Sequence, residues 1–311
     1  MEQEKQRLSI DVARLYYQSE YSQEQIAKRL GISRPTVSRL LQYAKDQGYV
    51  TIRIADPIED VNELSKRLKD KYKLDEVQVA FSPLSDYEVS IQHIGRKAAA
   101  YLYEIIKDGD IIGVTWGRTM YTLASQLKAK TTQGVEVVQL KGGVSHSQIN
   151  TYAPEIVDLF AKAYHTYARY LPLPVIFDTP ELKQMVEQDR HIRRIIELGK
   201  QSNIAIFTVG TVDDDALLFR LGYLGSEEKA ELQRNAVGDI CSRFFDTKGQ
   251  ICNHEIDSRT VGISLNDLRK KEKTVLVAGG QKKVAAIKAA FAGGYANTLI
   301  TDQFTAKALL E

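Results

Sequence analysis

The sequence predicts an α/β protein in which an N-terminal helix-turn-helix domain precedes a doubly wound, mostly parallel sheet. Three observations support this fold class. Residues 21–49 carry the start and stop signals of two short helices joined by a tight turn. From residue 77 onward, short apolar runs alternate with helical segments, which is typical of a parallel sheet with crossover helices. The runs EVVQL, IAIFTV and TVLVAG lack clean polar–apolar alternation, which indicates strands buried on both faces.

Length and composition limit the classes of protein to which the chain can belong. A chain of 311 residues is too long for one compact core of ordinary size, so we expect two domains, at residues 1–56 and 57–311. With 43% hydrophobic and 26% charged residues and no apolar run of membrane-spanning length, the chain is typical of a soluble globular protein. We expect no signal peptide before the first helix. The two cysteines, Cys241 and Cys252, suggest neither a disulfide framework nor a zinc site, so we expect a cytoplasmic location and core-filling cysteines.

Residues 4–31 predict two helices. The first spans residues 4–19 and has an apolar face made of Leu8, Val12, Leu15 and Tyr16. The second begins at Ser22, which can form a capping box with Gln25. Gly31 ends it, because glycine adopts positive φ without a steric penalty. The apolar face of this second helix consists of Ile26, Ala27 and Leu30.

A third helix begins after Ser33, which can cap it, and tolerates Pro35 in its first turn. Its buried stripe is Val37, Leu40, Leu41 and Ala44, and Gly48 ends it. Two short helices joined by a glycine turn form the helix-turn-helix arrangement, whose second helix lies in a DNA major groove. The outward-facing residues are Arg34, Thr36, Ser38, Arg39, Gln42 and Tyr43.

The charge pattern of this segment also favours DNA binding. Between Lys28 and Lys45 there are five basic residues and no acidic one, and arginine and hydroxyl side chains suit phosphates and guanine edges. The alternative is a helical hairpin with a solvated polar face. The net charge of the whole chain is only +2, so we expect binding strength to depend on assembly into a homodimer or homotetramer. The predicted DNA-binding residues are Lys28, Arg29, Ser33, Arg34, Thr36, Ser38, Arg39, Gln42 and Tyr43, with Lys45 as a further phosphate contact.

The domain boundary is predicted at Asp56-Pro57, which interrupts regular structure. A short strand over Tyr49–Ile54 precedes it, and a connector helix over Ile58–Tyr72 follows, with Val61, Leu64 and Leu68 facing inward. Strands are then predicted at residues 77–81, 110–115, 135–140, 173–177, 204–209, 274–278 and 298–301. Helices are predicted at residues 89–107, 118–128, 154–167, 181–201 and 282–291, and an inserted hairpin at residues 241–254 with Gly249 in a turn.

Four loops after predicted strands carry the chemistry of a ligand site, because ligands bind at the carboxyl ends of parallel strands. Two of them combine glycines with a cation and resemble anion cradles, residues 113–119 and 279–283. The other two are Lys141-Gly142-Gly143 and Gly238-Asp239, the latter offering a carboxylate to sugar hydroxyls. The predicted effector-binding residues are Thr115, Gly117, Arg118, Thr119, Lys141, Asp239, Gly279, Gly280 and Lys283.

Each loop also has a purely structural interpretation, since glycines after strands are often only turn residues. Two glycine-plus-cation loops at strand ends favour a phosphate site. Neither loop matches the G-x-G-x-x-G or the Walker pattern, so a dinucleotide or ATP is not expected. Trp116 is expected to be a packing residue. The five histidines, including His146, show no metal-binding spacing, and we expect no metal and no cofactor.

Several segments resemble one family. The segment LYYQSEYSQEQIAKRLGISRPTVSRLLQYAKDQGYV resembles the SorC family of bacterial sugar-responsive regulators. GVTWGRT, VEVVQLKGG, FTVGT, GDICSRFFD and VAGG resemble the effector domain of that family, so the resemblance covers essentially the whole chain. The segments LSIDVARLYYQSEYSQEQIA, QLKGGVSHS, NTYAPE and YLPLPV are similar to the deoxyribonucleoside regulators within the family.

The resemblance implies a tetrameric repressor of nucleoside-catabolism genes that is released by deoxyribose 5-phosphate. It also implies an effector domain similar in fold to sugar-phosphate isomerases and deaminases. That likeness leaves open an enzyme that acts on a sugar phosphate and also binds DNA, and a third alternative is an assembly protein with a vestigial site. An enzyme would need a positioned acid/base pair, and the sequence offers Asp239 without a convincing partner. We therefore expect a regulator rather than an enzyme.

Lys141 is the candidate for a covalent contact with the effector. It follows a buried strand, and Gly142-Gly143 let a ligand approach closely. A lysine amine in such a cleft loses hydration, which lowers its pKa and leaves more neutral amine. Open-chain deoxyribose 5-phosphate carries an aldehyde that a neutral amine can convert to a Schiff base. The alternatives are that Lys141 only donates hydrogen bonds to the sugar, or that it is a solvated loop residue.

Overall fold

The computed structural model describes residues 2–51 and 61–311 of the chain. It separates into two units, Met1–Ile58 and Glu59–Glu311. Each unit has apolar clusters of its own, one in the first and three in the second. The predicted boundary at Asp56-Pro57 lies outside the described residues.

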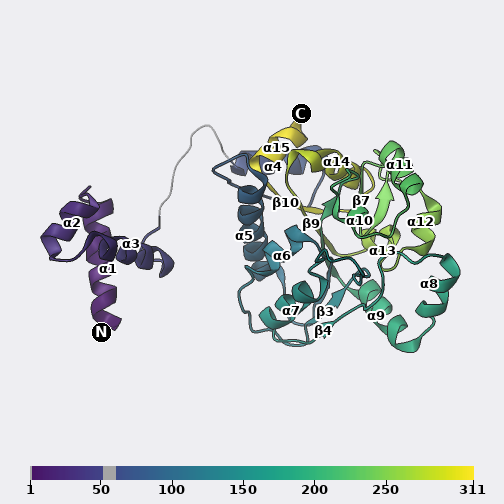
Figure 1. The fold of residues 1–311 in the computed structure, drawn as a ribbon, viewed down its shortest axis with the longest axis horizontal. Coiled ribbons are helices and arrows are strands. Elements are labelled where there is room, and N and C mark those ends of the chain that lie inside the picture. Colours follow the sequence, from purple (N-terminus) through teal and green to yellow (C-terminus); the bar gives the residue numbers. More distant parts are fainter. Residues whose placement is uncertain (1, 52–60) are drawn as a thin grey trace. The chain divides into compact units, whose positions relative to one another are not determined.

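The first unit contains three helices, α1 (Glu2–Tyr17), α2 (Gln23–Leu30) and α3 (Arg34–Asp46), shown in purple in Figure 1. The predicted capping box at the start of α2 is confirmed, because the Ser22 side chain accepts from the backbone of Gln25 and the Gln25 side chain accepts from the backbone of Ser22. Gly31 ends α2 at φ 66°, in the left-handed region that favours glycine. Ser33 caps α3. The local sequence signals therefore place both helices of the predicted motif.

The core of the first unit is the apolar stripe predicted for these helices. Its buried residues are Val12, Ala13, Ile26, Val37, Leu40, Leu41 and Ala44. Because this stripe faces inward, the opposite side of α3 is left to solvent. The predicted strand at Tyr49–Ile54 is not formed at Tyr49, Val50 and Thr51, and residues 52–54 lie outside the described part of the chain.

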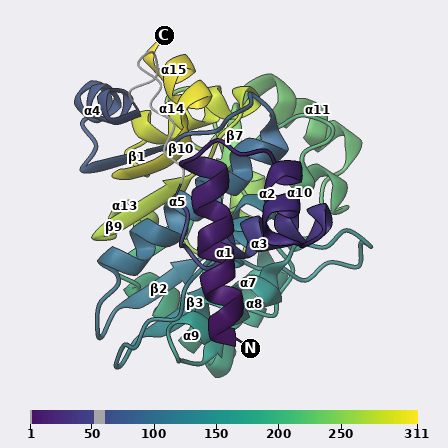
Figure 2. The same ribbon diagram turned by 90° about the vertical axis from the view of Figure 1, so that its left-hand side faces the viewer.

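The second unit is built around a seven-stranded sheet in the order β1-β10-β9-β5-β2-β3-β4. Every neighbouring pair in it is parallel, which confirms the predicted doubly wound, parallel arrangement. Figure 2 shows β1, β9, β2 and β3 in this order. The strands are β1 (Glu76–Ala80), β2 (Ile111–Val114), β3 (Glu136–Gln139), β4 (Ala168–Arg169), β5 (Ile204–Phe207), β9 (Lys273–Val277) and β10 (Thr298–Asp302).

Both faces of this sheet are buried, and successive residues of its central strands enter two different cores. In β5, Ile206 packs into one cluster and Phe207 into the other; in β9, Val275 and Leu276 divide in the same way. The first cluster also contains apolar residues of α5, α6 and α7, and the second contains those of α4, α14 and α15. Strands with helices on both faces need apolar residues at every position, which explains the lack of alternation in the sequence.

The helices of the second unit follow the strands along the chain. The early ones are α4 (Val61–Tyr72), α5 (Tyr87–Ile105), α6 (Arg118–Ala124), α7 (Ala153–Ala163), α8 (Pro180–Glu187) and α9 (Arg190–Gln201). The later ones are α10 (Leu217–Arg220), α11 (Ser226–Asn235), α12 (His254–Arg259), α13 (Leu265–Arg269), η1 (Gln281–Lys283), α14 (Val284–Ala292) and α15 (Gln303–Leu310). No helix of the described residues is long and apolar enough to cross a membrane.

Three predicted elements are wrong in detail. Residues 173–177 are not a strand: Pro174 and Ile176 form only isolated bridges, and the edge strand is the two-residue β4. The single helix predicted at residues 181–201 is two helices, because the Asp189 carboxylate caps α9 and interrupts the run. The predicted hairpin at residues 241–254 forms only a single antiparallel bridge, between Phe245 and Ile251, with Gly249 in the turn as predicted. The regular hairpin lies earlier, as β7 (Gly238–Ile240) and β8 (Arg243–Phe245), which join β6 (Val209–Gly210) in a small antiparallel sheet.

Candidate functional site

A cleft of about 860 Å³ opens in the second unit where several strands end. Because the large sheet is entirely parallel, the segments after β2, β3, β5 and β9 leave the same edge of it. The cleft is lined by residues from each of these segments and by Asp239 of β7. The predicted placement of a ligand site at the strand ends thus corresponds to a real cavity of a size that holds a small molecule.

The cleft brings together eight of the nine residues predicted to bind an effector. These are Gly117, Arg118, Thr119, Lys141, Asp239, Gly279, Gly280 and Lys283. Thr115 is the exception: it is 3% exposed and is absent from the cleft lining. Its hydroxyl is buried without a hydrogen-bond partner among the described residues.

Lys141 is buried in the wall of the cleft, with 6% of its surface exposed. Its Nζ lies 3.6 Å from the centre of the Trp116 ring and donates a 3.2 Å hydrogen bond to Ser242 Oγ. Trp116 is itself held, since its Nε1 donates to the carbonyl oxygen of Gly142 at 2.6 Å. The expectation that Trp116 packs in the core is confirmed, and the indole also forms a face against which the lysine amine rests.

Burial also sets the ionisation of the cleft's two central titratable groups. Loss of hydration lowers the pKa of the Lys141 amine from its usual 10.5, an effect that the neighbouring Asp239 and Cys241 oppose. Burial raises the pKa of the Asp239 carboxyl, and Lys141 opposes that shift. Both shifts favour the neutral forms. A neutral lysine amine is a nucleophile, so the lowered pKa of Lys141 acts in the direction that the chemistry predicted for it requires.

The turn between β7 and β8 holds Asp239 and Ser242 in place. Asp239 Oδ2 accepts a 2.9 Å hydrogen bond from the backbone N–H of Ser242. Asp239 Oδ1 lies so close to Gly210 that a Cβ added there would be 2.0 Å away. Only glycine therefore fits at position 210 without displacing the carboxylate.

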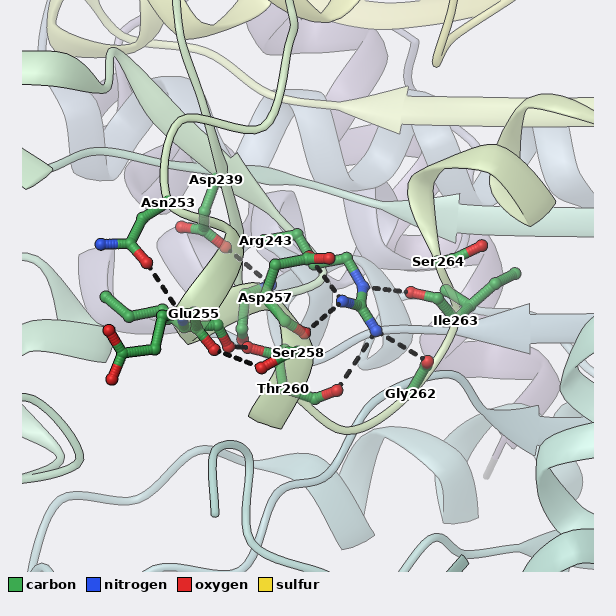
Figure 3. Close-up of polar contacts among 12 residues, drawn as sticks. Asp239, Arg243, Asn253, Glu255, Asp257, Ser258, Thr260, Gly262, Ile263 and Ser264 are labelled. Atoms are coloured by element: carbon green, nitrogen blue, oxygen red, sulfur yellow. Dashed lines mark hydrogen bonds and ion pairs between the residues drawn. The ribbon is translucent and has the colours of Figure 1, made fainter. Parts of the chain in front are cut away.

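Arg243, which follows this turn, fastens the hairpin to the segment beside Lys141 (Figure 3). Its guanidinium donates to the carbonyl oxygens of Asp257, Thr260, Gly262 and Ile263 and to the Asp257 carboxylate at 2.6 Å. Gly262 in turn forms an isolated antiparallel bridge with Lys141. The backbone of Lys141 is thus supported through residues that lie about 100 positions later in the chain.

The loop after β9 has the features of an anion cradle. Gly280 has φ 100°, which a side chain would disfavour, and its N–H donates to Thr305 Oγ1 at 2.7 Å. Thr305 is held by a 2.7 Å bond to Asp302. The loop continues into η1 and the N-terminus of α14, which has no side-chain cap. Lys283, at this N-terminus, brings its Nζ within 3.4 Å of Thr208 Oγ1 in the same cleft.

Of the other three cations that line the cleft, Arg118, Arg220 and Lys282, two are paired with acids at its rim. Arg118 forms an ion pair with Glu88, and its side chain is 62% exposed. Lys282 pairs with Asp215 at 3.1 Å and with Asp213 at 3.6 Å, and the hydrogen bond that it donates to Asp215 raises the pKa of its amine. Among the described cations of the cleft, Lys141 and Lys283 are therefore the two whose amines are not engaged by a carboxylate in an ion pair.

Sequence reasoning missed several cleft residues. Thr208 and Thr211 follow β5 within the segment FTVGT, and the signal that could have found them is their position after a fully buried strand. Ser242, which does not line the cleft but accepts a hydrogen bond from Lys141, had no signal, because it becomes important only through the shape of the hairpin turn. The further lining residues are Tyr87, Ile149, Asn150, Tyr152, Val209, Gly210, Ala216, Leu217, Leu218, Arg220 and Gln281. The described residues contain no His, Cys, Asp and Glu group that could hold a metal ion.

The exposed face of α3 in the first unit holds the predicted DNA-binding residues. Arg34, Ser38, Arg39 and Gln42 are exposed, as are Lys28 and Arg29 at the end of α2. Thr36 is half-buried and shares a 2.8 Å hydrogen bond with Ser33. Tyr43 is half-buried beneath Lys5, whose Nζ lies 4.2 Å from the ring centre, so this ring is less available than predicted.

Comparisons with known proteins agree with both units. Residues 56–311 match the family model of a sugar-binding domain, and residues 13–57 match that of the MarR family. The chain is 61% identical over 310 residues to the deoxyribonucleoside regulator of Bacillus subtilis, covering 100% of this chain and 99% of that protein. It is 32% identical to the sorbitol operon regulator of Klebsiella pneumoniae, over 98% of each chain.

Solved structures extend this likeness to the fold. The crystal structure of the full-length sorbitol operon regulator SorC from Klebsiella pneumoniae superimposes with a TM-score of 0.79 at 30% identity, over 98% of this chain and 99% of that one. These relatives are named as transcriptional regulators and not as enzymes. The chain belongs to the SorC family of transcriptional regulators, in which a helix-turn-helix unit precedes a sugar-binding domain.

Proposed function

We propose that this regulator represses genes of deoxyribonucleoside catabolism and is released from its operator by deoxyribose 5-phosphate. One observation carries the choice of effector: a single cleft contains a buried lysine amine that favours its neutral form and a separate anion cradle. An aldehyde and a phosphate at opposite ends of one small sugar match these two features. The name of the 61% identical relative supports the same class of effector.

The phosphate is placed at the loop after β9. The N-terminus of α14, which has no side-chain cap, attracts an anion, and Lys283 adds a positive charge. The segment from Gly117 to Thr119 lines the same cleft and offers further N–H and hydroxyl donors. Arg118 contributes less than its charge suggests, because Glu88 neutralises it.

The aldehyde is placed at Lys141. The neutral amine adds to the first carbon of the open-chain sugar, and one N–H proton passes to the carbonyl oxygen to give a carbinolamine. Loss of that hydroxyl, with one proton, as water leaves a C=N bond between Lys141 and the sugar. Asp239, whose pKa burial raises, is the group in the cleft that can supply the proton for this water. No net oxidation occurs, and hydrolysis of the imine returns the free sugar.

The operator is bound by the first unit, with α3 in the major groove. Arg34, Ser38 and Arg39 are exposed on this helix and lie where base edges are read, whereas Lys28 and Arg29 suit phosphates. A unit of three helices makes few contacts with DNA, so we propose that the protein acts as a homodimer or homotetramer that binds two half-sites. Light scattering of the protein alone and with operator tests this assembly.

A thermal-shift screen of sugar phosphates tests the effector. A ligand that binds only the folded protein stabilises it by RT ln(1 + [L]/Kd), about 2.7 kcal/mol at 100 times Kd. We expect deoxyribose 5-phosphate to raise the melting temperature more than ribose 5-phosphate, glucose 6-phosphate or inorganic phosphate. A screen in which another sugar phosphate gives the largest shift would replace the effector while leaving the site in place.

Replacing Lys283 with alanine should weaken deoxyribose 5-phosphate binding about 10- to 100-fold. A hydrogen bond to a charged group contributes about 1.5–3 kcal/mol, and Lys283 is the unpaired cation of the cradle. Isothermal titration calorimetry measures the change. Lys282→Ala is the matched control: it removes a neighbouring charge that Asp215 already engages at the exposed rim, so its effect should stay within about twofold. Equal losses in the two variants would contradict the placement of the phosphate.

Operator DNA should weaken effector binding by the same factor by which the effector weakens operator binding. The cleft is in one unit and the DNA-binding face in the other, so release requires two arrangements of the protein that the effector binds unequally. Fluorescence anisotropy with labelled operator gives one factor, and effector titration with and without unlabelled operator gives the other. Identical effector affinity in the two titrations would exclude an effector-driven release.

A further inference from the structure

The turn that joins β7 to β8 is strained in a way that points to a function. Its two residues, Cys241 and Ser242, have φ 54° and 65°, so both lie in the left-handed region. A hairpin with two consecutive left-handed residues normally carries Asn-Gly or Gly-Gly, because other side chains cost free energy there. The residues before and after the turn are paired, Ile240 with Arg243. The strain is therefore confined to two buried non-glycine residues.

In this conformation Ser242 makes two hydrogen bonds, one as a donor and one as an acceptor. Its backbone N–H donates to Asp239 Oδ2 at 2.9 Å, and its hydroxyl oxygen accepts from Lys141 Nζ at 3.2 Å. Arg243, immediately after it, is anchored by five hydrogen bonds, so the turn has little freedom to shift. Strained backbone that the surroundings hold in place is typical of functional sites.

The surroundings of Lys141 Nζ indicate what the hydroxyl achieves there. A neutral amine has two N–H bonds and one lone pair around its nitrogen. Ser242 Oγ accepts one N–H, and the Trp116 ring, with its centre 3.6 Å from Nζ, faces the other. Since Lys141 and Trp116 both line the cleft, the lone pair is left to point toward a ligand bound there.

We propose that Ser242 is a positioning residue for covalent capture of the effector: its hydroxyl orients the Lys141 amine so that the lone pair faces the aldehyde carbon. This inference rests on the proposed Schiff base at Lys141. The amine gives up one N–H proton when the carbinolamine forms, and keeps the other. When the hydroxyl departs as water, taking one proton from solvent or from Asp239, the protonated imine still carries that one N–H. Ser242 Oγ can accept it at every stage.

Two substitutions separate the hydroxyl from the backbone strain. Ser242→Gly removes the hydroxyl and also relieves the left-handed conformation, so its melting temperature should equal or exceed that of the wild type. Ser242→Ala removes the hydroxyl and keeps the strain. If the hydroxyl orients the amine, the two variants lose the same function although their stabilities differ.

The experiment measures covalent capture and non-covalent affinity separately in the full-length protein. Borohydride reduction in the presence of deoxyribose 5-phosphate, followed over time by intact-protein mass spectrometry, gives the rate of adduct formation. Deoxyribitol 5-phosphate, which has no aldehyde, reports the affinity of the cleft by calorimetry. We expect both variants to form adduct about 10- to 100-fold more slowly, since small losses of alignment cost that much. Their affinity for deoxyribitol 5-phosphate should change by less than about twofold.

The outcomes that contradict the inference are distinct. Adduct formation at the wild-type rate in both variants overturns it. A rate that stays normal in Ser242→Gly and falls only in Ser242→Ala shows that backbone geometry matters and the hydroxyl does not, which also overturns it. Equal losses of deoxyribitol 5-phosphate affinity and of adduct rate assign Ser242 a merely structural role. Wild-type protein that forms no adduct contradicts the Schiff base itself, a result recognised before either variant is tested.

Discussion

Replacing Lys141 with methionine should abolish the borohydride-trapped adduct with deoxyribose 5-phosphate while the protein stays folded. Methionine keeps an unbranched chain of similar length against Trp116 but has no amine. Peptide mass spectrometry of the wild type should place the mass gain on Lys141. Lys283→Ala is the control, because it should weaken binding yet still form adduct at saturating sugar. An adduct of unchanged yield in Lys141→Met, or one mapped to another lysine, would contradict the covalent assignment.

The pH dependence of adduct formation and of protein stability tests the role of Lys141 in a second way. Burial lowers the pKa of the Lys141 amine below its usual 10.5, so trapping should become faster as pH rises and the amine loses its proton. The effect of pH on the free energy of unfolding is opposite in sign to that of a lysine in a favourable ion pair. Because the pKa of Lys141 is lower in the folded state, its burial lowers the free energy of unfolding by the full amount at low pH. This destabilisation disappears as pH rises toward 10.5. Lys141→Met should therefore melt no lower than the wild type at neutral pH.

Replacing Arg39 with alanine should weaken operator binding about 5- to 150-fold and reduce discrimination between operator and scrambled DNA. Arg39 is exposed in the middle of α3, and its only described hydrogen bond, 3.4 Å from Nε to the carbonyl oxygen of Pro35, leaves the guanidinium tip available. A bidentate contact with a base is worth about 1–3 kcal/mol. Fluorescence anisotropy with a sequence selected from random DNA by the wild type, and with its scrambled counterpart, gives the ratio.

Lys28→Ala is the matched control for this prediction. Lys28 is exposed at the end of α2 and is assigned to a phosphate. Its loss should weaken operator and scrambled DNA alike and make the dependence of log K on log salt shallower by about one. If Arg39→Ala gave the same uniform loss, the base-reading role of Arg39 would be wrong.

The sequence predicts the fold well where the signal is local. The capping box at Ser22, the left-handed Gly31 and the cap at Ser33 depend on a few adjacent residues, and each appears in the structure as predicted. The same holds for the sheet, because strands covered on both faces must be apolar throughout, and a run such as IAIF is readable without knowing its neighbours.

Predictions fail where the outcome depends on distant contacts or on a cap inside a helical pattern. Residues 173–177 have a strand-like composition, but Pro174 and Ile176 meet only single partners, Val144 and Thr260, so no ladder forms. The division between α8 and α9 depends on whether Asp189 caps a new helix, which helical periodicity does not reveal.

The candidate site divides in the same way. Glycine-rich loops after buried strands identify most of the cleft from the sequence, since a parallel sheet brings such loops to one edge. Ser242 and Arg243 could not be found, because their importance depends on a turn geometry that their own residue types disfavour. Thr115 was wrongly placed in the cleft, since its side chain points into the core instead of continuing the loop.

The walls of the cleft come from segments between Tyr87 and Lys283, which span most of the second unit. Any local opening that pulls one of these segments away also dismantles the cleft, so a bound sugar phosphate opposes all such openings together. At 100 times Kd, the fraction of opened protein falls about 100-fold. Proteases of the cell cut opened chains in proportion to that fraction when opening is fast. If the proposed function is correct, we expect the lifetime of the regulator to depend on the sugar, with the slowest degradation while the sugar is abundant.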